Sequence, residues 1–177
     1  MKKYPFFYFL FFVFFLVFLD QLLKIWVFKN QFNLFGGDWW WDNLSFFKIT
    51  YLENSGMAFG FLNNSGWVVK LFLTLFRIIA VFIMFFYVFF EHKKKPVIFL
   101  FVFAMLVSGA VGNCIDSVFY DFLNLNNNAG GFLFHGKVID MFSFSFFPPV
   151  FNLADSYITI GCVLVLIFYK KLSSISV

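Results

Sequence analysis

The sequence has few charged residues, and this shortage excludes most soluble folds. Only 12% of its 177 residues are charged, whereas 62% are hydrophobic. Soluble domains average roughly 25% charged and 45–50% apolar residues. A soluble fold of this length has too little interior to hide so much apolar surface. We therefore expect the lipid bilayer to surround most of the chain.

Residues for metal binding and for nucleophilic catalysis are also scarce. The two cysteines, Cys114 and Cys162, lie inside apolar segments, where a free cysteine behaves as a small hydrophobe. The chain has no C-x-x-C pair or Cys/His cluster, which argues against zinc. It also lacks a G-x-S-x-G elbow and a serine with a suitable histidine base. We expect no metal and no cofactor.

Four apolar stretches are long enough for transmembrane helices. A span needs about 20 mostly apolar residues, and the stretches that qualify are 6–28, 67–90, 97–118 and 150–169. No small-x-small cleavage site follows the first stretch, so we interpret it as a retained helix and not as a signal peptide. Without internal repeats, the chain is predicted to form a single integral membrane domain over residues 1–177.

Lysine residues predict the orientation of these helices. Lysines gather at the amino terminus, in the 91–95 turn and just after residue 169, and lysine-rich short loops stay in the cytoplasm. Both termini are therefore predicted to be cytoplasmic, with the connections 29–66 and 119–149 facing outward. The net charge of +4 follows this pattern, which indicates membrane topology and not nucleic-acid binding.

The two outer connections have different compositions. Residues 39–41 are three tryptophans, typical of the membrane interface, and the run 46–52 favours β-structure on the bilayer surface. The second connection contains the Asn/Gly-rich stretch 124–131, which we expect to be a flexible insertion.

Polar residues in or beside the spans gather at one depth. Charged groups in a membrane segment are costly and are functional hypotheses by default. With the predicted orientation, the outer ends of the first, third and fourth helices bring the following residues into one layer: Asp20, Lys24, Asn113, Asp116, Asp140, Asn152 and Asp155.

Some of these residues have structural explanations. Asp20 and Lys24 are spaced i,i+4 in the favourable acid-first order, so a structural ion pair and a functional site remain equal alternatives. The stretch 152–155 matches a capping box, with an acid that suits the positive helix end. Asp116 lies at a helix C-terminus, where the dipole disfavours its charge, so another group must hold it. Asp140 lies in a predicted loop, with apolar neighbours that draw it toward the membrane surface.

Two carboxyl groups held close together can hydrolyse a peptide bond. Repulsion prevents both from ionising easily, so they share a proton. One then activates water while the protonated partner polarises a carbonyl, as in aspartic proteases. A transporter or proton channel and a non-catalytic scaffold remain alternatives. The acids form one layer and no path across the membrane, and the chain has no duplicated halves, which disfavours a transporter.

Five motifs, in order, resemble those of the lipoprotein signal peptidase (type II signal peptidase) family. The matching segments are Asp20-Gln21-x-x-Lys24, Asn54-Ser55-Gly56-Met57-Ala58-Phe59-Gly60, Ser108-Gly109-Ala110-Val111-Gly112-Asn113-Cys114-Ile115-Asp116, Val138-Ile139-Asp140 and Phe151-Asn152-Leu153-Ala154-Asp155-Ser156. The resemblance implies that Asp140 and Asp155 are the catalytic dyad of an aspartic endopeptidase. It implies supporting roles for Asp20, Lys24, Asn54, Gly56, Asn113, Asp116, Asn152 and Ala154.

The resemblance also implies a fold, a substrate and a location. The expected fold is an all-α membrane protein of four transmembrane helices, with a small extracytoplasmic β-cradle after the first helix. The implied substrate is a diacylglyceryl-modified bacterial prolipoprotein, cut just before its lipidated cysteine. The enzyme is then expected in the cell inner membrane, with its site near the extracytoplasmic face. Its expected partners are lipidated prolipoproteins and membrane lipids, with no nucleic acid, and we expect a monomer.

One position departs from the family pattern. The family commonly has arginine directly after the third-helix aspartate, whereas this chain has Ser117. We hypothesise that Lys137 supplies the missing outer cation.

Overall fold

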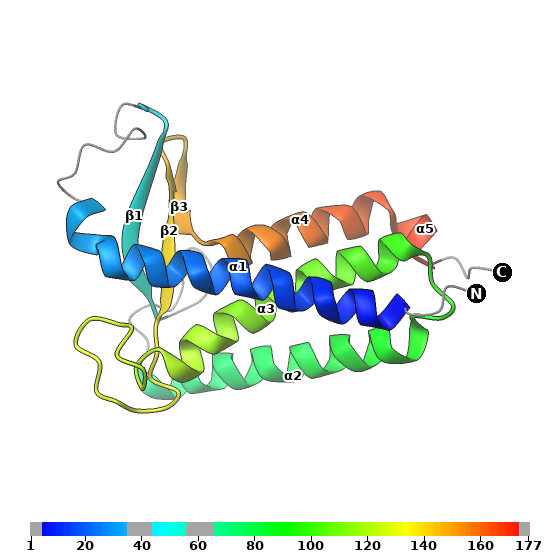
Figure 1. Cartoon of the computed structure of the whole chain (residues 1–177), viewed down its shortest axis with the longest axis horizontal. Coiled ribbons are helices and arrows are strands. Elements are labelled where there is room, and N and C mark those ends of the chain that lie inside the picture. The colour runs from blue at the N-terminus through cyan, green and yellow to red at the C-terminus, as the bar shows by residue number, and fades with distance from the viewer. Residues whose placement is uncertain (1–4, 35–43, 56–65, 174–177) are drawn as a thin grey trace.

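The chain forms a helix bundle with a small sheet across one end (Figure 1). The structure, a computed structural model, describes residues 5–34, 44–55 and 66–173. The first turn of α1, the turn between α2 and α3, and α5 lie at the end opposite the sheet (Figure 1). The elements are α1 (Pro5–Leu34), β1 (Phe47–Asn54), α2 (Trp67–Glu91), α3 (Val97–Phe119), β2 (Val138–Phe144), β3 (Phe147–Phe151), α4 (Leu153–Ile167) and α5 (Tyr169–Ser173).

Three helices of the described chain are long and apolar enough to cross a membrane: α1, α2 and α3. The helix α4 is a shorter apolar helix of 15 residues. It begins at Leu153 and not at 150, because residues 147–151 form an edge strand, where the two prolines of that strand are tolerated. The fourth predicted span is therefore shorter than expected, and the chain continues beyond Phe168 as α5.

The helix α3 lies at the centre of the bundle. It packs against α1, α2 and α4, and 61% of its most apolar window is buried, against 17% for α1 and 11% for α2. The outer faces of the other helices expose large apolar side chains such as Phe14, Phe72 and Leu166. This arrangement suits lipid as the surrounding medium, because water would penalise these faces.

Strands of the sheet come from both connections that the sequence predicts to face outward. Its order is β1-β2-β3, with antiparallel pairs throughout. The expectation of a mainly helical protein with a small sheet after the first helix is therefore confirmed, and the second connection supplies two of the three strands. Asp140 lies on β2 opposite Leu52 and not in a loop. Because β2 is the central strand, its neighbours Ile139 and Met141 are fully buried, and Asp140 is buried with them.

The Asn/Gly-rich stretch 124–131 is folded and held by hydrogen bonds, contrary to the expected flexible insertion. The Asp121 carboxylate accepts the backbone N–H groups of Gly130 and Phe132 at 3.0 and 2.8 Å. Positive φ angles occur at Asn124, Asn128 and Gly131, residue types that tolerate this conformation. The composition therefore serves tight turns.

Candidate active site

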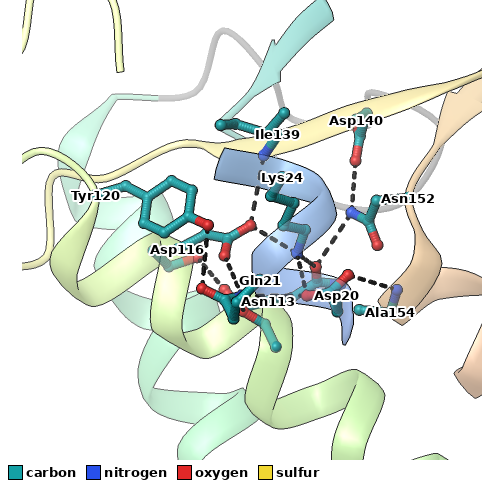
Figure 2. Close-up of polar contacts among 12 residues, drawn as sticks. Asp20, Gln21, Lys24, Asn113, Asp116, Tyr120, Ile139, Asp140, Asn152 and Ala154 are labelled. Atoms are coloured by element: carbon teal, nitrogen blue, oxygen red, sulfur yellow. Dashed lines mark hydrogen bonds and ion pairs between the residues drawn. The ribbon is translucent and has the colours of Figure 1, made fainter. Parts of the chain in front are cut away.

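Most of the predicted site residues meet in one polar cluster, where the helix ends reach the sheet (Figure 2). The described members come from α1, β1, α3, β2 and the start of α4, and almost all are buried. Gly56 lies outside the described residues. The structure brings together the following predicted residues: Asp20, Lys24, Asn54, Asn113, Asp116, Asp140, Asn152, Ala154 and Asp155.

A fully buried lysine lies at the centre of the cluster. Lys24 Nζ lies 2.9 Å from Asp20 Oδ2 and 2.7 Å from Asp116 Oδ2, and it donates to Asn113 Oδ1 at 3.0 Å. The predicted i,i+4 ion pair is therefore confirmed. The second ion pair explains how Asp116 is held at a helix C-terminus, because the ammonium group offsets the unfavourable dipole.

Two residues of the cluster, Gln21 and Tyr120, are not among the site residues predicted from the sequence. Gln21 Nε2 donates to Asp116 Oδ1 at 2.9 Å and to Asp20 Oδ2 at 3.1 Å. Its Oε1 accepts the Tyr120 hydroxyl at 3.0 Å. A glutamine inside an apolar span is itself costly, so depth in the membrane gave a usable signal for Gln21. Tyr120 follows α3, and no local pattern marks it.

Two glycines of α3, Gly109 and Gly112, allow α1 and the start of α4 to pack closely against it. A Cβ atom on Gly112 would lie 2.6 Å from Asp20 Oδ2, and a Cβ on Gly109 would lie 2.4 Å from the Ala154 carbonyl oxygen. Asp20 Oδ1 accepts the Ala154 backbone N–H at 2.9 Å. These contacts fix the first turn of α4 against α1 and α3.

The start of α4 serves as a cap and as part of the cluster. Asn152 Oδ1 accepts the Asp155 N–H at 2.9 Å, and Asp155 Oδ2 accepts the Asn152 N–H at 3.3 Å, which confirms the capping box. The remaining amide group of Asn152 donates to Asp140 Oδ1 at 2.7 Å and to Asn113 Oδ1 at 3.2 Å. Asn113 Nδ2 in turn donates to Asp155 Oδ1 at 2.8 Å. Two neighbouring amides thus connect the two acids.

Asp140 has an environment suited to holding a proton near neutral pH. Burial raises its pKa to about 7, and the nearby charge of Asp155 acts in the same direction. Hydrogen bonds from Asn54 and Asn152 and the charge of Lys24 oppose this shift. Asn54 Nδ2 donates to Asp140 Oδ2 at 3.0 Å. One buried carboxyl group and one partly exposed carboxyl group therefore share a small polar site, which permits general acid–base chemistry.

Other cations lie apart from the acid pair. Lys137 Nζ pairs with Glu53 Oε2 at 2.8 Å, whereas the ion pairs with Asp20 and Asp116 come from Lys24. The hypothesis that Lys137 supplies the outer cation stays a prediction. Arg77 Nη1 donates to Ser117 Oγ at 3.3 Å. Within residues 5–34, 44–55 and 66–173, no group of three His, Cys, Asp or Glu side chains is arranged to hold a metal ion.

The chain is similar to known proteins in sequence and in fold. Residues 12–170 match the family described as signal peptidase (SPase) II. The lipoprotein signal peptidase of Porphyromonas gingivalis (strain ATCC 33277) is 35% identical over 189 residues, covering 89% of this chain and 80% of the relative. That of Clostridium tetani (strain Massachusetts / E88) is 33% identical, covering 86% of each chain. A solved bacterial membrane enzyme matches with a TM-score of 0.67 and 27% identity, over 96% of this chain and 92% of that chain.

Proposed function

The chain belongs to the signal peptidase II family, and we propose that it is an aspartic endopeptidase acting on lipidated bacterial prolipoproteins. It removes the signal peptide by cutting just before the diacylglyceryl-modified cysteine. The observation that carries the proposal is the Asn113–Asn152 amide bridge, which connects Asp140 to Asp155. The names of the relatives, lipoprotein signal peptidases, support the substrate.

The catalytic step uses the two carboxyl groups and one water molecule. Asp140 and Asp155 share one proton, because a second negative charge in the buried site is unfavourable. The ionised carboxylate removes a proton from water, and the water oxygen attacks the scissile carbonyl carbon. The other carboxyl group gives its proton to the carbonyl oxygen. When the tetrahedral intermediate collapses, one of its two hydroxyl groups returns a proton to the ionised carboxylate as the C=O bond re-forms. The C–N bond breaks, and the leaving amine takes a proton from the other carboxyl group, so the dyad again holds one shared proton.

The amides and the buried lysine hold this arrangement in place. Asn54 and Asn152 each donate to one oxygen of Asp140, so its carboxyl plane is fixed. Asn113 donates to Asp155 and accepts from Lys24. The hydrogen bond from the buried ammonium group therefore fixes the orientation of the amide that holds Asp155. Rigid support of this kind lowers the reorganisation needed in the transition state.

We further propose that the enzyme spans the inner membrane four times as a single, monomeric domain, with both termini in the cytoplasm. Lysines cluster at the α2–α3 turn and in α5, which lie at the same end of the bundle as the start of α1 (Figure 1). The positive-inside rule assigns this end to the cytoplasm. The dyad then lies near the extracytoplasmic face, where the lipid-modified cysteine of an exported precursor would arrive.

Cleavage of matched precursors tests the proposal. The purified protein in lipid is incubated with a prolipoprotein carrying diacylglyceryl cysteine and with the same precursor lacking the lipid, in the presence of a chelator. The expected product begins at the lipidated cysteine, as measured by mass spectrometry, and the unlipidated precursor stays intact. Absence of cleavage of the lipidated precursor, or equal cleavage of both, would overturn the proposed function.

A further inference from the structure

A second set of polar contacts connects the 124–131 loop to the strand that carries Asp140. Asn126 Nδ2 donates to the Lys137 carbonyl oxygen at 3.1 Å, and the Lys137 N–H donates back to Asn126 Oδ1 at 2.7 Å. The buried Asn126 amide thus hydrogen-bonds to both backbone groups of the residue directly before β2, which begins at Val138. Hydrogen bonds to the backbone fix the position of the chain, and not only the direction of a side chain.

The same loop is attached to the strand that carries Asn54. Glu53 Oε1 accepts the Asn127 N–H at 2.5 Å, and Glu53 Oε2 pairs with Lys137 Nζ at 2.8 Å. Burial works against the charge of Glu53, but hydrogen bonds from Lys137, Tyr51 and Asn127 outweigh it and lower the pKa of Glu53. Charge-assisted hydrogen bonds of this kind are stronger than neutral ones. We call Glu53, Asn126, Asn127 and Lys137 the loop latch.

The loop latch lies where β1 and β2 present their site residues. Glu53 pairs in register with Ile139, and Asn54 pairs with Val138. Glu53 therefore lies directly before Asn54, and Lys137, directly before β2, lies three positions from Asp140. The Asn54 and Asp140 side chains are hydrogen-bonded at 3.0 Å. A shift of either strand at the latch would change the distance between these two side chains.

We propose that the loop latch positions the Asn54 amide against the Asp140 carboxyl group. The proposal rests on the proposed function, since Asp140 is there a member of the dyad. The Lys137–Glu53 ion pair is only partly buried, with side chains 42% and 12% exposed, so solvent screening limits its contribution to stability. The backbone contacts of Asn126 and Asn127 are better explained by a need for exact strand placement.

Removal of the Asn126 side chain tests the position of Asn54 without changing any charge near Asp140. Asp140 is influenced by the charges of Asp155 on α4 and Lys24 on α1 and by the amides of Asn54 and Asn152. Glu53 and Lys137 neutralise each other, and Asp116 on α3 is paired with Lys24. Asn126→Ala leaves all of these charges unchanged. A change in the proton affinity of Asp140 would therefore report displacement of Asn54.

The test is a pH titration of Asp140 by infrared spectroscopy. Its carboxyl C=O band is isolated by subtracting the spectrum of Asp140→Asn. Because the Asn54 hydrogen bond favours the ionised form, Asn126→Ala should raise the pKa of Asp140 by roughly half a unit to one unit. Asn128→Gly, a neighbouring change in the same loop at a positive φ, should leave it unchanged. An unshifted titration in a folded Asn126→Ala protein would overturn the proposal.

A second pair of variants keeps the proposal testable if Asn126→Ala does not fold. Glu53→Gln keeps one acceptor oxygen, enough for the Asn127 N–H, whereas Glu53→Ala removes both acceptor oxygens. Both variants remove the same charge, so the alanine variant should show the larger shift. In an Asn54→Ala background, neither latch variant should shift the titration further. In cleavage assays, latch variants should lower kcat about tenfold with KM unchanged. If the wild type does not cleave but the latch variants shift the pKa of Asp140, the proposed function is wrong and the positioning role of the loop latch is supported.

Discussion

Replacement of Lys24 by methionine should strongly destabilise the protein. Methionine fills a similar volume but removes the ammonium group that lies 2.9 and 2.7 Å from the carboxylates of Asp20 and Asp116. All three side chains are fully buried, so neither acid can recover its charge balance from water. Removing one partner of a buried ion pair costs roughly 3–5 kcal/mol. Since about 1.4 kcal/mol is a factor of ten, we expect the unfolding equilibrium to shift by at least about a hundredfold.

Reversible unfolding in mixed micelles, followed by circular dichroism, measures this loss. The matched control is Lys48→Met on the exposed side of β1, which should stay within about 0.5 kcal/mol of the wild type. Adding Asp20→Asn and Asp116→Asn to Lys24→Met should recover part of the loss, because no buried charge then remains unpaired. The reasoning is refuted if Lys24→Met unfolds with a free energy within about 1 kcal/mol of the wild type, the scale of an ordinary substitution.

Three further predictions follow from the site geometry. Gly112→Ala should lower both the stability and the cleavage rate, because the new Cβ would lie 2.6 Å from Asp20 Oδ2. The control Gly66→Ala, whose Cβ would have no atom within 4 Å, should change neither. Thermal unfolding compares the stability of the two variants. Asn152→Ser should keep the helix cap but lose the hydrogen bond to Asp140. Stability should therefore stay within about 1 kcal/mol of the wild type while kcat falls strongly. A serine variant with wild-type activity would contradict the role of the amide bridge in catalysis. Folding raises the pKa of Asp140 from 3.8 to about 7, so native stability should fall as pH rises between these values. Asp140→Asn should flatten that slope in unfolding titrations at pH 5 and 8, and equal slopes would contradict it.

The acid cluster could be predicted because the membrane makes charge expensive. Asp20, Lys24 and Asp116 stand out in apolar spans, and helix geometry with a fixed orientation places them at one depth. The capping box at Asn152 is equally local, since it depends on residues three apart in sequence. The sequence therefore predicts those features whose causes lie within one helix or in the bilayer itself.

The strand pairing could not be predicted in the same way. The pairing of Leu52 with Asp140 joins residues far apart in sequence, and Asp140 was expected in a loop. The prolines of β3 argue against a strand unless its position at the sheet edge is known. The start of α4 depends on that strand, so the fourth span was placed too early. Tyr120 is the C-cap residue of α3 and joins the site only because α1 packs against α3, which brings Gln21 to the Tyr120 hydroxyl.

The most direct test of the dyad is the single-turnover rate of lipidated precursor cleavage in three acid-to-amide variants. Asp140→Asn and Asp155→Asn should each abolish cleavage while remaining folded, since the shared proton needs both carboxyl groups. Glu91→Gln, at the opposite end of the bundle, should cleave at the wild-type rate. Cleavage by either aspartate variant at a rate near that of the wild type would contradict the two-carboxylate mechanism.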